Sequence, residues 1–297
     1  MKLKNSRFDS AFDAVVLVMV AFVMLIMLYP LYFILTASVS DPSAVTNGKT
    51  LFGPVGLNFK GYAMIFRNGM ILTGYYNTIR YALFGTLIGL FVTIPAGYAL
   101  SIPNLPGKRF VTLLMIFTMY FSGGFIPSYI VVKNLGLINT PYVLMIVGSF
   151  TVFNAVISRT FFATTIPSEL REAAEIDGCS IGKFFVLVVL PLSKAIIAVI
   201  ALYYASGHWN AYFSAVIYIT KNSLYPLQLV LRNILVASQY SGMVSGSMSG
   251  QDMADLQNVA ETIKYGVIVV GSLPIIMMYP FIQRYFVKGL MIGSLKG

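Results

Sequence analysis

The fold is decided by the stretch Ala14–Ser40, which reads AVVLVMVAFVMLIMLYPLYFILTASVS and contains no charged side chain. A membrane helix needs about 20 mostly apolar residues, so this stretch is long enough to cross a bilayer. Lys2, Lys4 and Arg7 precede it, as they would in a secretory signal, but the apolar core of a signal is only about 7–15 residues long. We therefore expect a retained membrane span.

The composition of the whole chain agrees with a membrane protein. Hydrophobic residues make up 58% of the 297 residues and charged residues 10%, whereas soluble domains are roughly 45–50% apolar and about 25% charged. These values exclude an ordinary soluble domain and a disordered chain. The lone Cys179 cannot pair within the chain, which excludes a disulfide scaffold and a cysteine-based zinc site.

Uncharged runs of sufficient length recur along the chain. After Ala14–Ser40 they are Tyr81–Gly107, Phe110–Val132, Asn134–Ser158, Ala195–Thr220 and Tyr265–Gln283. Because prolines and polar residues shorten each run, we expect six transmembrane helices at about 14–38, 81–102, 110–131, 141–158, 195–219 and 265–283. A seventh uncharged run, Asn233–Gln251, is rich in serine and glycine and is interpreted as a flexible loop. The sequence thus predicts an all-α membrane protein with one transmembrane domain, residues 14–297.

Basic residues predict the orientation, because lysine and arginine collect on cytoplasmic loops. Placing both termini in the cytoplasm puts most of the 20 basic residues there. In this arrangement the N-terminal segment 1–13 and the loop 159–194 are cytoplasmic, and the segments 41–80 and 221–264 are outer loops. The net charge of +10 is explained by topology and needs no nucleic acid.

The inner loop 159–194 contains signals for two short helices. Pro167 and Ser168 favour a helix start, and Gly178 favours its end. A second start follows at Ser180, and Pro191 interrupts the next apolar run. The small residues at 173 and 174 would let another protein's surface approach closely, although a solvated connector would have a similar composition.

The spacing within this loop is specific. It reads Glu172-Ala173-Ala174, three residues, Gly178, nine residues, and Val188-x-Leu190-Pro191. It resembles the EAA loop of ATP-binding-cassette (ABC) importer permeases, E-A-A-x3-G-x9-I-x-L-P, with valine in place of isoleucine. The resemblance implies coupling helices that seat in a groove of an ATPase subunit. It assigns this role to Glu172, Ala173, Ala174, Gly178, Leu190 and Pro191.

The resemblance extends over nearly the whole chain. The segments 121–127, 135–140 and 283–293, with Tyr76-Asn77-Thr78 and Trp209-Asn210, are similar to the MalG-like permeases. Among them the chain resembles the LplC/YtcP-type group, associated with polysaccharides and complex oligosaccharides, of the binding-protein-dependent transport inner-membrane components. This implies a MetI-like bundle of six helices in the bacterial cytoplasmic membrane.

The resemblance also implies partners and a mechanism. The partners would be a second, similar permease, two ATPase subunits that hold ATP and magnesium, and an extracytoplasmic solute-binding protein. Carbohydrate would cross by alternating access. The serine-rich segment 238–250 of the outer loop would contact the binding protein.

Catalytic patterns in the chain are weak. Gly178-Cys179-Ser180-Ile181-Gly182 satisfies G-x-S-x-G, but that motif needs a strand before the serine, and a helix is expected there. The chain has no Walker-type phosphate loop and no HExxH motif. We therefore expect a non-enzymatic subunit without its own cofactor or metal. Alternatives are a permease for a non-sugar solute and a membrane-embedded enzyme acting on glycans or lipids.

The spans contain no acidic residue, which suits a path for a neutral solute. Tyr204, His208 and Tyr212 would share one helical face at i, i+4 and i+8. We predict that the substrate path includes Tyr204, His208, Trp209, Asn210, Tyr212, Tyr120 and Ser122. Tyrosine and tryptophan also populate interfacial belts, and histidine or asparagine often bonds between helices, so that interpretation stays open. The repeat of glycine at 85 and 89 predicts close helix packing.

Overall fold

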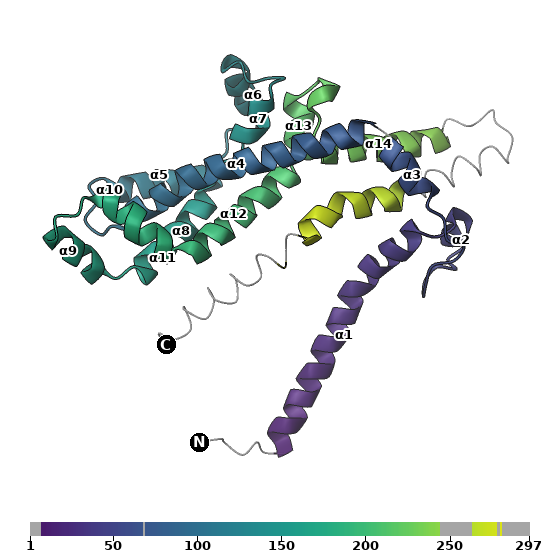
Figure 1. Cartoon of the computed structure of the whole chain (residues 1–297), viewed down its shortest axis with the longest axis horizontal. Helices are drawn as coiled ribbons and strands as arrows, with labels where there is room; N and C mark the ends of the chain where they lie inside the picture. Colours follow the sequence, from purple (N-terminus) through teal and green to yellow (C-terminus); the bar gives the residue numbers. More distant parts are fainter. Residues whose placement is uncertain (1–6, 68, 244–262, 278–279, 281–297) are drawn as a thin grey trace. The chain divides into compact units, whose positions relative to one another are not determined.

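A computed structural model describes residues 7–67, 69–243, 263–277 and 280, and every regular element in this part of the chain is a helix (Figure 1). The chain divides into two compact units, which are considered separately. Unit 1 comprises Met1–Asn68 and Arg232–Leu273, and unit 2 comprises Gly69–Leu231 and Pro274–Gly297.

Unit 1 begins with the long apolar helix α1, Arg7–Ser38. Its segment Ala11–Ser38 is long and apolar enough to span a membrane, and its most apolar window buries no residue within the chain. Two short helices follow, α2 at Pro42–Thr46 and α3 at Lys60–Arg67. Because α1 makes almost no core contacts, its apolar surface must be covered by lipid or by another protein.

The segment after α1 is held by local hydrogen bonds. The Asp41 carboxylate accepts hydrogen bonds from the Ser43 amide (3.0 Å) and hydroxyl (2.5 Å), which caps α2. The hydrogen bond from the Ser43 hydroxyl is the main cause that lowers the pKa of Asp41 below its ordinary value. Tyr62 donates to the Ser38 hydroxyl at 2.9 Å and so ties α3 to the end of α1.

Unit 2 is organised around α4, Gly69–Ser101, which begins at Gly69 and not at the predicted position 81. It packs along α12 (Lys194–Trp209), α8 (Val152–Thr165) and α7 (Pro141–Ile146), as Figure 1 shows. The glycine repeat on α4 explains how closely these helices approach.

A Cβ on Gly85 would overlap the imidazole of His208, and one on Gly89 would lie 2.8 Å from the Ser149 carbonyl oxygen and from the Tyr204 ring. Two glycines on α4 thus leave room for two large side chains of α12.

The third predicted span is broken in the structure. Helix α5, Lys108–Tyr120, and helix α6, Phe125–Asn134, meet at an angle of 115° across the residues 121–124. The fourth is also interrupted, because α7 ends at Ile146 and α8 begins at Val152. Among the described residues, two helices are long and apolar enough to cross a membrane, or up to four if each bent pair counts as one span. The six-span count therefore stays a prediction.

The beginning of the fifth span is bent. Helix α10 (Ile181–Phe184), the π-helical turn η1 (Phe185–Val189) and α11 (Leu190–Leu192) precede α12, and the bend between the two parts is 82°. Pro191 explains the irregular turn, because proline has no N–H to donate and its ring clashes with the preceding turn. After α12 come α13 (Tyr212–Tyr218) and the 3-10 turn η2 (Asn222–Leu224).

The interpretation of Asn233–Gln251 as a flexible loop is wrong over its first part. Helix α14 runs from Leu227 to Met243. Leu227, Val230 and Leu231 are buried in its first turns, so packing starts a helix that continues into the serine-rich stretch. Residues 244–251 lie outside the described part of the chain. The helix Ile263–Met277 overlaps residues 265–277 of the sixth predicted span.

Two apolar clusters hold unit 2 together. One surrounds Tyr81 and joins α4 to α7, α13 and the start of α14. The other surrounds Tyr98 and Ile200 and joins α4 to α8, the α10–η1 turn and α12. The second cluster, called here the Tyr98 cluster, lies directly beneath the loop predicted to couple to an ATPase.

Candidate functional site

The two short helices of the loop 159–194 begin where the sequence predicts. Helix α9, Ser168–Ile176, begins directly after Pro167, with Glu169 in its first turn. Gly178 has the left-handed φ of +71°, and the Cys179 amide donates to the Ala174 carbonyl at 2.8 Å. This hydrogen bond and the positive φ define a Schellman end, where glycine is favoured because it has no Cβ.

The second helix start is also confirmed. The Ser180 hydroxyl accepts the Lys183 amide at 3.4 Å and so caps α10. A helix, not a strand, precedes Ser180, so the surroundings do not match a hydrolase nucleophile turn.

Helix α9 presents two different faces. Glu172 and Ala173 are exposed, while Ala174 and Cys179 are half-buried against the Tyr98 cluster. On the outer face Ile176 is 87% exposed, although its neighbours are mostly polar. Together with the exposed Ala173, three residues earlier, Ile176 makes this part of the outer face apolar. Sequence reasoning missed Ile176, which helical spacing places four residues after Glu172.

The inner face of α9 is connected to the long helices. The Tyr98 ring of α4 lies 5.7 Å from the Phe162 ring of α8 and 5.1 Å from the Phe185 ring of η1, measured between centroids. Leu190 is half-buried against this cluster, whereas Pro191 is exposed. The inner face of α9 therefore rests on a cluster of packed aromatic rings that also contacts α4 and α8.

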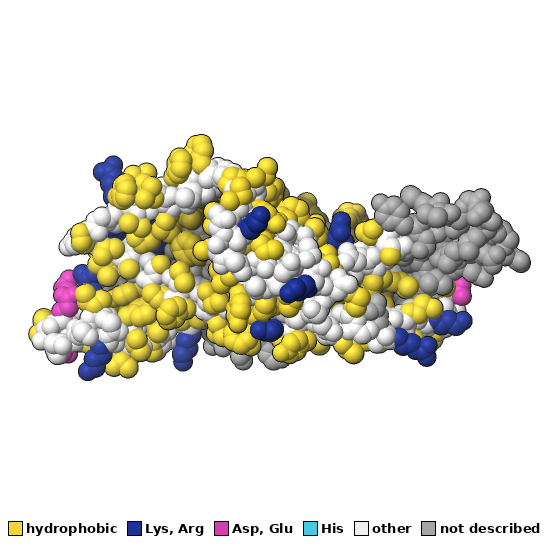
Figure 2. Space-filling model, turned by 90° about the horizontal axis from the view of Figure 1, so that it is seen from above, with side chains coloured by type: hydrophobic (Ala, Val, Ile, Leu, Met, Phe, Trp, Pro, Cys, Tyr) yellow, Lys and Arg dark blue, Asp and Glu magenta, His cyan; other side chains and the backbone are white. Residues whose placement is uncertain are grey.

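Charge is distributed unevenly over unit 2. Between Gly69 and Leu231, every acidic residue lies in the segment from Glu169 to Asp177. Figure 2 shows acidic side chains gathered beside lysine and arginine where α9 lies, while hydrophobic side chains cover much of the remaining visible surface. Arg171 and Glu175 form an ion pair on α9, with Nε and Oε1 3.5 Å apart.

Two of the predicted substrate-path residues fill the interior of unit 2. Tyr204 is 2% exposed, and its hydroxyl shares a hydrogen bond with the Thr93 hydroxyl (2.6 Å) and accepts the Thr151 amide (3.2 Å). His208 is also buried, with its ring close to the backbone of Gly85. Both side chains join α12 to neighbouring helices.

The prediction that Tyr204, His208 and Tyr212 share one face of a continuous helix is wrong. Helix α12 ends at Trp209, and Asn210 caps it, with its side-chain amide donating to the Ser206 carbonyl at 2.9 Å. Tyr212 belongs to α13 beyond this break and is 44% exposed. Trp209 is buried and its ring lies 6.3 Å from that of Tyr75 on α4.

The other predicted path residues lie at the break of the third span. Tyr120 ends α5 and is 74% exposed, and the Ser122 hydroxyl accepts the Gly124 amide at 3.2 Å. The rings of Phe125 on α6 and Phe213 on α13 pack edge to face with centroids 5.3 Å apart. Because Phe125 begins α6 and Phe213 follows Tyr212, this contact joins the start of α6 to α13.

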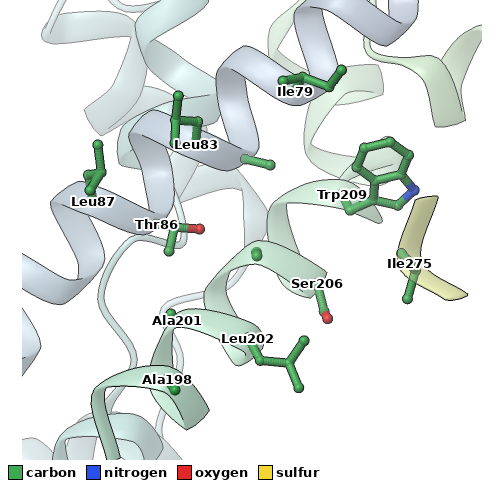
Figure 3. A pocket seen from close by; sticks show the side chains of 12 residues that line it. Ile79, Leu83, Thr86, Leu87, Ala198, Ala201, Leu202, Ser206, Trp209 and Ile275 are labelled. Atoms are coloured by element: carbon green, nitrogen blue, oxygen red, sulfur yellow. The ribbon is translucent and has the colours of Figure 1, made fainter. Parts of the chain in front are cut away.

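A pocket of about 440 Å³ lies between α4 and α12 (Figure 3). Its walls include Leu83 and Leu87 on one helix and small residues such as Ala198 and Ala201 on the other, with Trp209 at one end. The lining is almost entirely apolar. Sugar hydroxyls need hydrogen-bond partners, so this pocket does not have the chemistry of a carbohydrate subsite.

Among the described residues, no group of three or more histidine, cysteine, aspartate or glutamate side chains could hold a metal ion.

Comparisons with known proteins identify the family of the chain. The family model of the "Binding-protein-dependent transport system inner membrane component" matches residues 69–292. The chain is 35% identical over 299 residues to the "Polygalacturonan/rhamnogalacturonan transport system permease protein YtcP" of Bacillus subtilis, covering 99% of this chain and 100% of the relative. It is also 35% identical to "Protein LplC" of the same organism, covering 99% and 98%.

A solved structure is similar as well. It is a bacterial ABC transporter involved in the import of the acidic polysaccharide alginate, with a TM-score of 0.82 and 31% sequence identity over 96% of this chain and all of that chain. The matched family model covers most of the chain, including α9 and the Tyr98 cluster. The chain therefore belongs to the inner-membrane components of binding-protein-dependent transport systems.

Proposed function

We propose that this chain is a permease subunit of an ATP-driven importer that carries an oligosaccharide or a polysaccharide fragment across the cytoplasmic membrane. The observation that carries the proposal is the exposed helix α9, which ends at a left-handed Gly178 and rests on the Tyr98 cluster. The cargo class is supported by the relatives, whose names specify polygalacturonan and rhamnogalacturonan transport, and alginate import.

The proposed assembly contains this chain, a second similar permease, two ATPase subunits and an extracytoplasmic solute-binding protein. ATP and magnesium belong to the ATPase subunits, and the chain itself is without a catalytic site. Six spans with both termini in the cytoplasm remain part of the proposal, with the loop 159–194 inside and the loops 41–80 and 221–264 outside. The segment 238–250, of which residues 238–243 continue α14, is proposed to contact the binding protein.

The proposed mechanism starts at the outer face of α9. Closure of the ATPases on ATP moves α9 through Glu172, Ala173 and Ile176, and the Tyr98 cluster passes this movement to α4 and α8. The bundle then alternates between inward-facing and outward-facing states, and ATP can drive the change only through contacts that differ between the two states.

The route of the cargo is also a proposal. Tyr120, Ser122 and Tyr212 are accessible on the surface and can meet sugar hydroxyls and ring faces directly. Tyr204, His208 and Trp209 are buried among neighbouring helices, so cargo would reach these three only after a helix movement. Asn210 is exposed just beyond the end of α12.

The test replaces Gly178, where a Cβ would meet no atom within 4 Å, so the surrounding fold can accept a side chain. Gly178→Asp adds a side chain and a negative charge, and Gly178→Asn adds the same shape without the charge. Both residues tolerate a left-handed φ better than most. The complete importer is reconstituted in vesicles, and ATP hydrolysis stimulated by the loaded binding protein is measured.

We expect Gly178→Asp to reduce this stimulated hydrolysis about tenfold, equivalent to about 1.4 kcal/mol of docking free energy. Gly178→Asn should retain more activity, because only the charge differs. Full stimulated hydrolysis in the aspartate variant would contradict the coupling role of α9. The cargo is tested separately by binding a glycan panel, with peptides and amino acids as controls, to the cognate binding protein.

A further inference from the structure

A second pocket, of about 740 Å³, lies at the start of α5 and has no role in the function proposed above. It is lined by the turn from Pro103 to Gly107, the first residues of α5, and Arg159 of α8. Three cationic side chains line it, namely Lys108, Arg109 and Arg159. We call it the basic pocket.

The three cations of the basic pocket have no ion-pair partner among the described residues. All acidic residues between Gly69 and Leu231 lie in the segment 169–177. Among the described residues, Arg171 and Glu175 form an ion pair, and no ion pair involves the three cations of the basic pocket. The Lys108 ammonium donates to the Ile102 carbonyl at 3.1 Å, which holds it over the turn. Three cations without a carboxylate favour an anionic ligand.

The backbone adds to this preference. Helix α5 has 13 residues, and its N-cap Gly107 provides no side chain to satisfy the first N–H groups. A helix N-terminus carries partial positive charge and binds phosphate oxygens readily. The pocket thus offers both positive charge and backbone donors.

The surroundings point to a lipid as the source of the anion. Phe110 and Leu113 line the same pocket and are 67% and 59% exposed, so apolar surface continues directly from the cations along α5. Pro103 lines both this pocket and the neighbouring one at Pro167–Arg171, which places it beside α9. If α9 docks an ATPase, the basic pocket faces the cytoplasmic leaflet. The assignment of the pocket to this leaflet therefore rests on the proposed function.

We infer that the basic pocket binds the phosphate of an anionic phospholipid in the cytoplasmic leaflet, with Arg109 and Arg159 as the principal charged contacts. Basic pockets between transmembrane helices on this side of a membrane are suited to anionic head groups. The acyl chains of the lipid would cover Phe110 and Leu113. A free phosphate ion would fill only the polar half of the pocket.

The test uses the complete importer in nanodiscs of phosphatidylcholine and phosphatidylglycerol in equal parts. After release from the discs, native mass spectrometry counts the phosphatidylglycerol retained by the unmodified importer and by the double variant Arg109→Gln, Arg159→Gln. Lys194→Gln is the matched control, because Lys194 is an exposed basic residue at the start of α12 outside the basic pocket. The charge-preserving pair Arg109→Lys, Arg159→Lys controls for folding.

Each lost charge should weaken lipid retention about fivefold, so the double glutamine variant should lose roughly 25-fold. The Lys194→Gln and double lysine variants should retain the lipid. In the unmodified importer, retention should favour phosphatidylglycerol over phosphatidylcholine and fall as salt rises.

Equal retention by the double glutamine variant, or an equal loss in Lys194→Gln, would overturn the inference. Displacement of the lipid by millimolar inorganic phosphate would overturn the lipid as the occupant. Lipid retention is measured without cargo or ATP. If the proposed transport function is wrong, transport assays would show it, and the measured lipid retention would not change.

Discussion

The hydroxyl of Tyr204 connects three helices, and removing it should destabilise the protein by a calculable amount. Tyr204→Phe breaks the 2.6 Å bond to Thr93 on α4 and the 3.2 Å bond from the Thr151 amide at the start of α8. Hydrogen bonds between membrane helices contribute about 0.6 kcal/mol on average and at most about 1.7. The Thr93 hydroxyl can recover part of its loss by turning to a carbonyl of its own helix. We expect a net cost of about 1–2 kcal/mol.

The assay is the unfolding of the purified importer in detergent, with Tyr203→Phe as the control. Tyr203 is the preceding residue on α12, is 44% exposed, and contacts Phe153 through its ring. Its hydroxyl is not part of the interior network, so the control should change stability by less than about 0.5 kcal/mol. A double-mutant cycle with Thr93→Val then isolates the energy of the bond between the two side chains.

Equal stability of Tyr204→Phe and Tyr203→Phe would refute the reasoning from buried hydrogen bonds. The same variant also shows whether the Tyr204 hydroxyl contacts the cargo. If its role is to join helices, transport by the folded variant should keep an unchanged KM, whereas a lost contact with cargo would raise it.

Three further perturbations have expected outcomes. Gly85→Ala should cost about 1–2 kcal/mol in unfolding measurements, because overlap with His208 outweighs the helix propensity gained; unchanged stability would contradict this packing. Asn139 has φ +58° and accepts the Thr220 amide at 2.6 Å, so Asn139→Ala should lower thermal stability more than Asn139→Gly, which avoids the left-handed strain. The pKa of Asp41 is lowered by folding, so its stabilising effect is present above its ordinary pKa and lost as the pH falls through the folded value. The protection of the amides of residues 43–46 against exchange should show this dependence, and Asp41→Asn should remove it.

Local signals in the sequence predicted the bounds of α9 well. Pro167 and Gly178 bound α9 where expected, because a helix start and a left-handed end depend mainly on the residues at those positions. Close packing at Gly85 and Gly89 was likewise predictable from their spacing and is confirmed.

Breaks inside uncharged runs were less predictable. Hydropathy does not distinguish one span from two helices joined at 115°, so the break at residues 121–124 was missed, although Ser122 and two glycines lie there. The same holds for the end of α12, which separates Tyr212 from Tyr204 and His208. The interpretation of residues 233–251 as a loop was wrong over its first part because α14 begins upstream, at Leu227, where its side chains are buried. The composition of the serine-rich stretch alone does not reveal these contacts.

The turn after α9 has a practical consequence. Cys179 is the only cysteine of the chain and follows Gly178 directly, half-buried at the edge of the proposed docking surface. A thiol-reactive fluorophore or spin label can therefore be attached at this turn in the unmodified sequence. If the partner subunits contribute no accessible thiol, such a probe would report docking and release of an ATPase during each transport cycle, without any engineered residue.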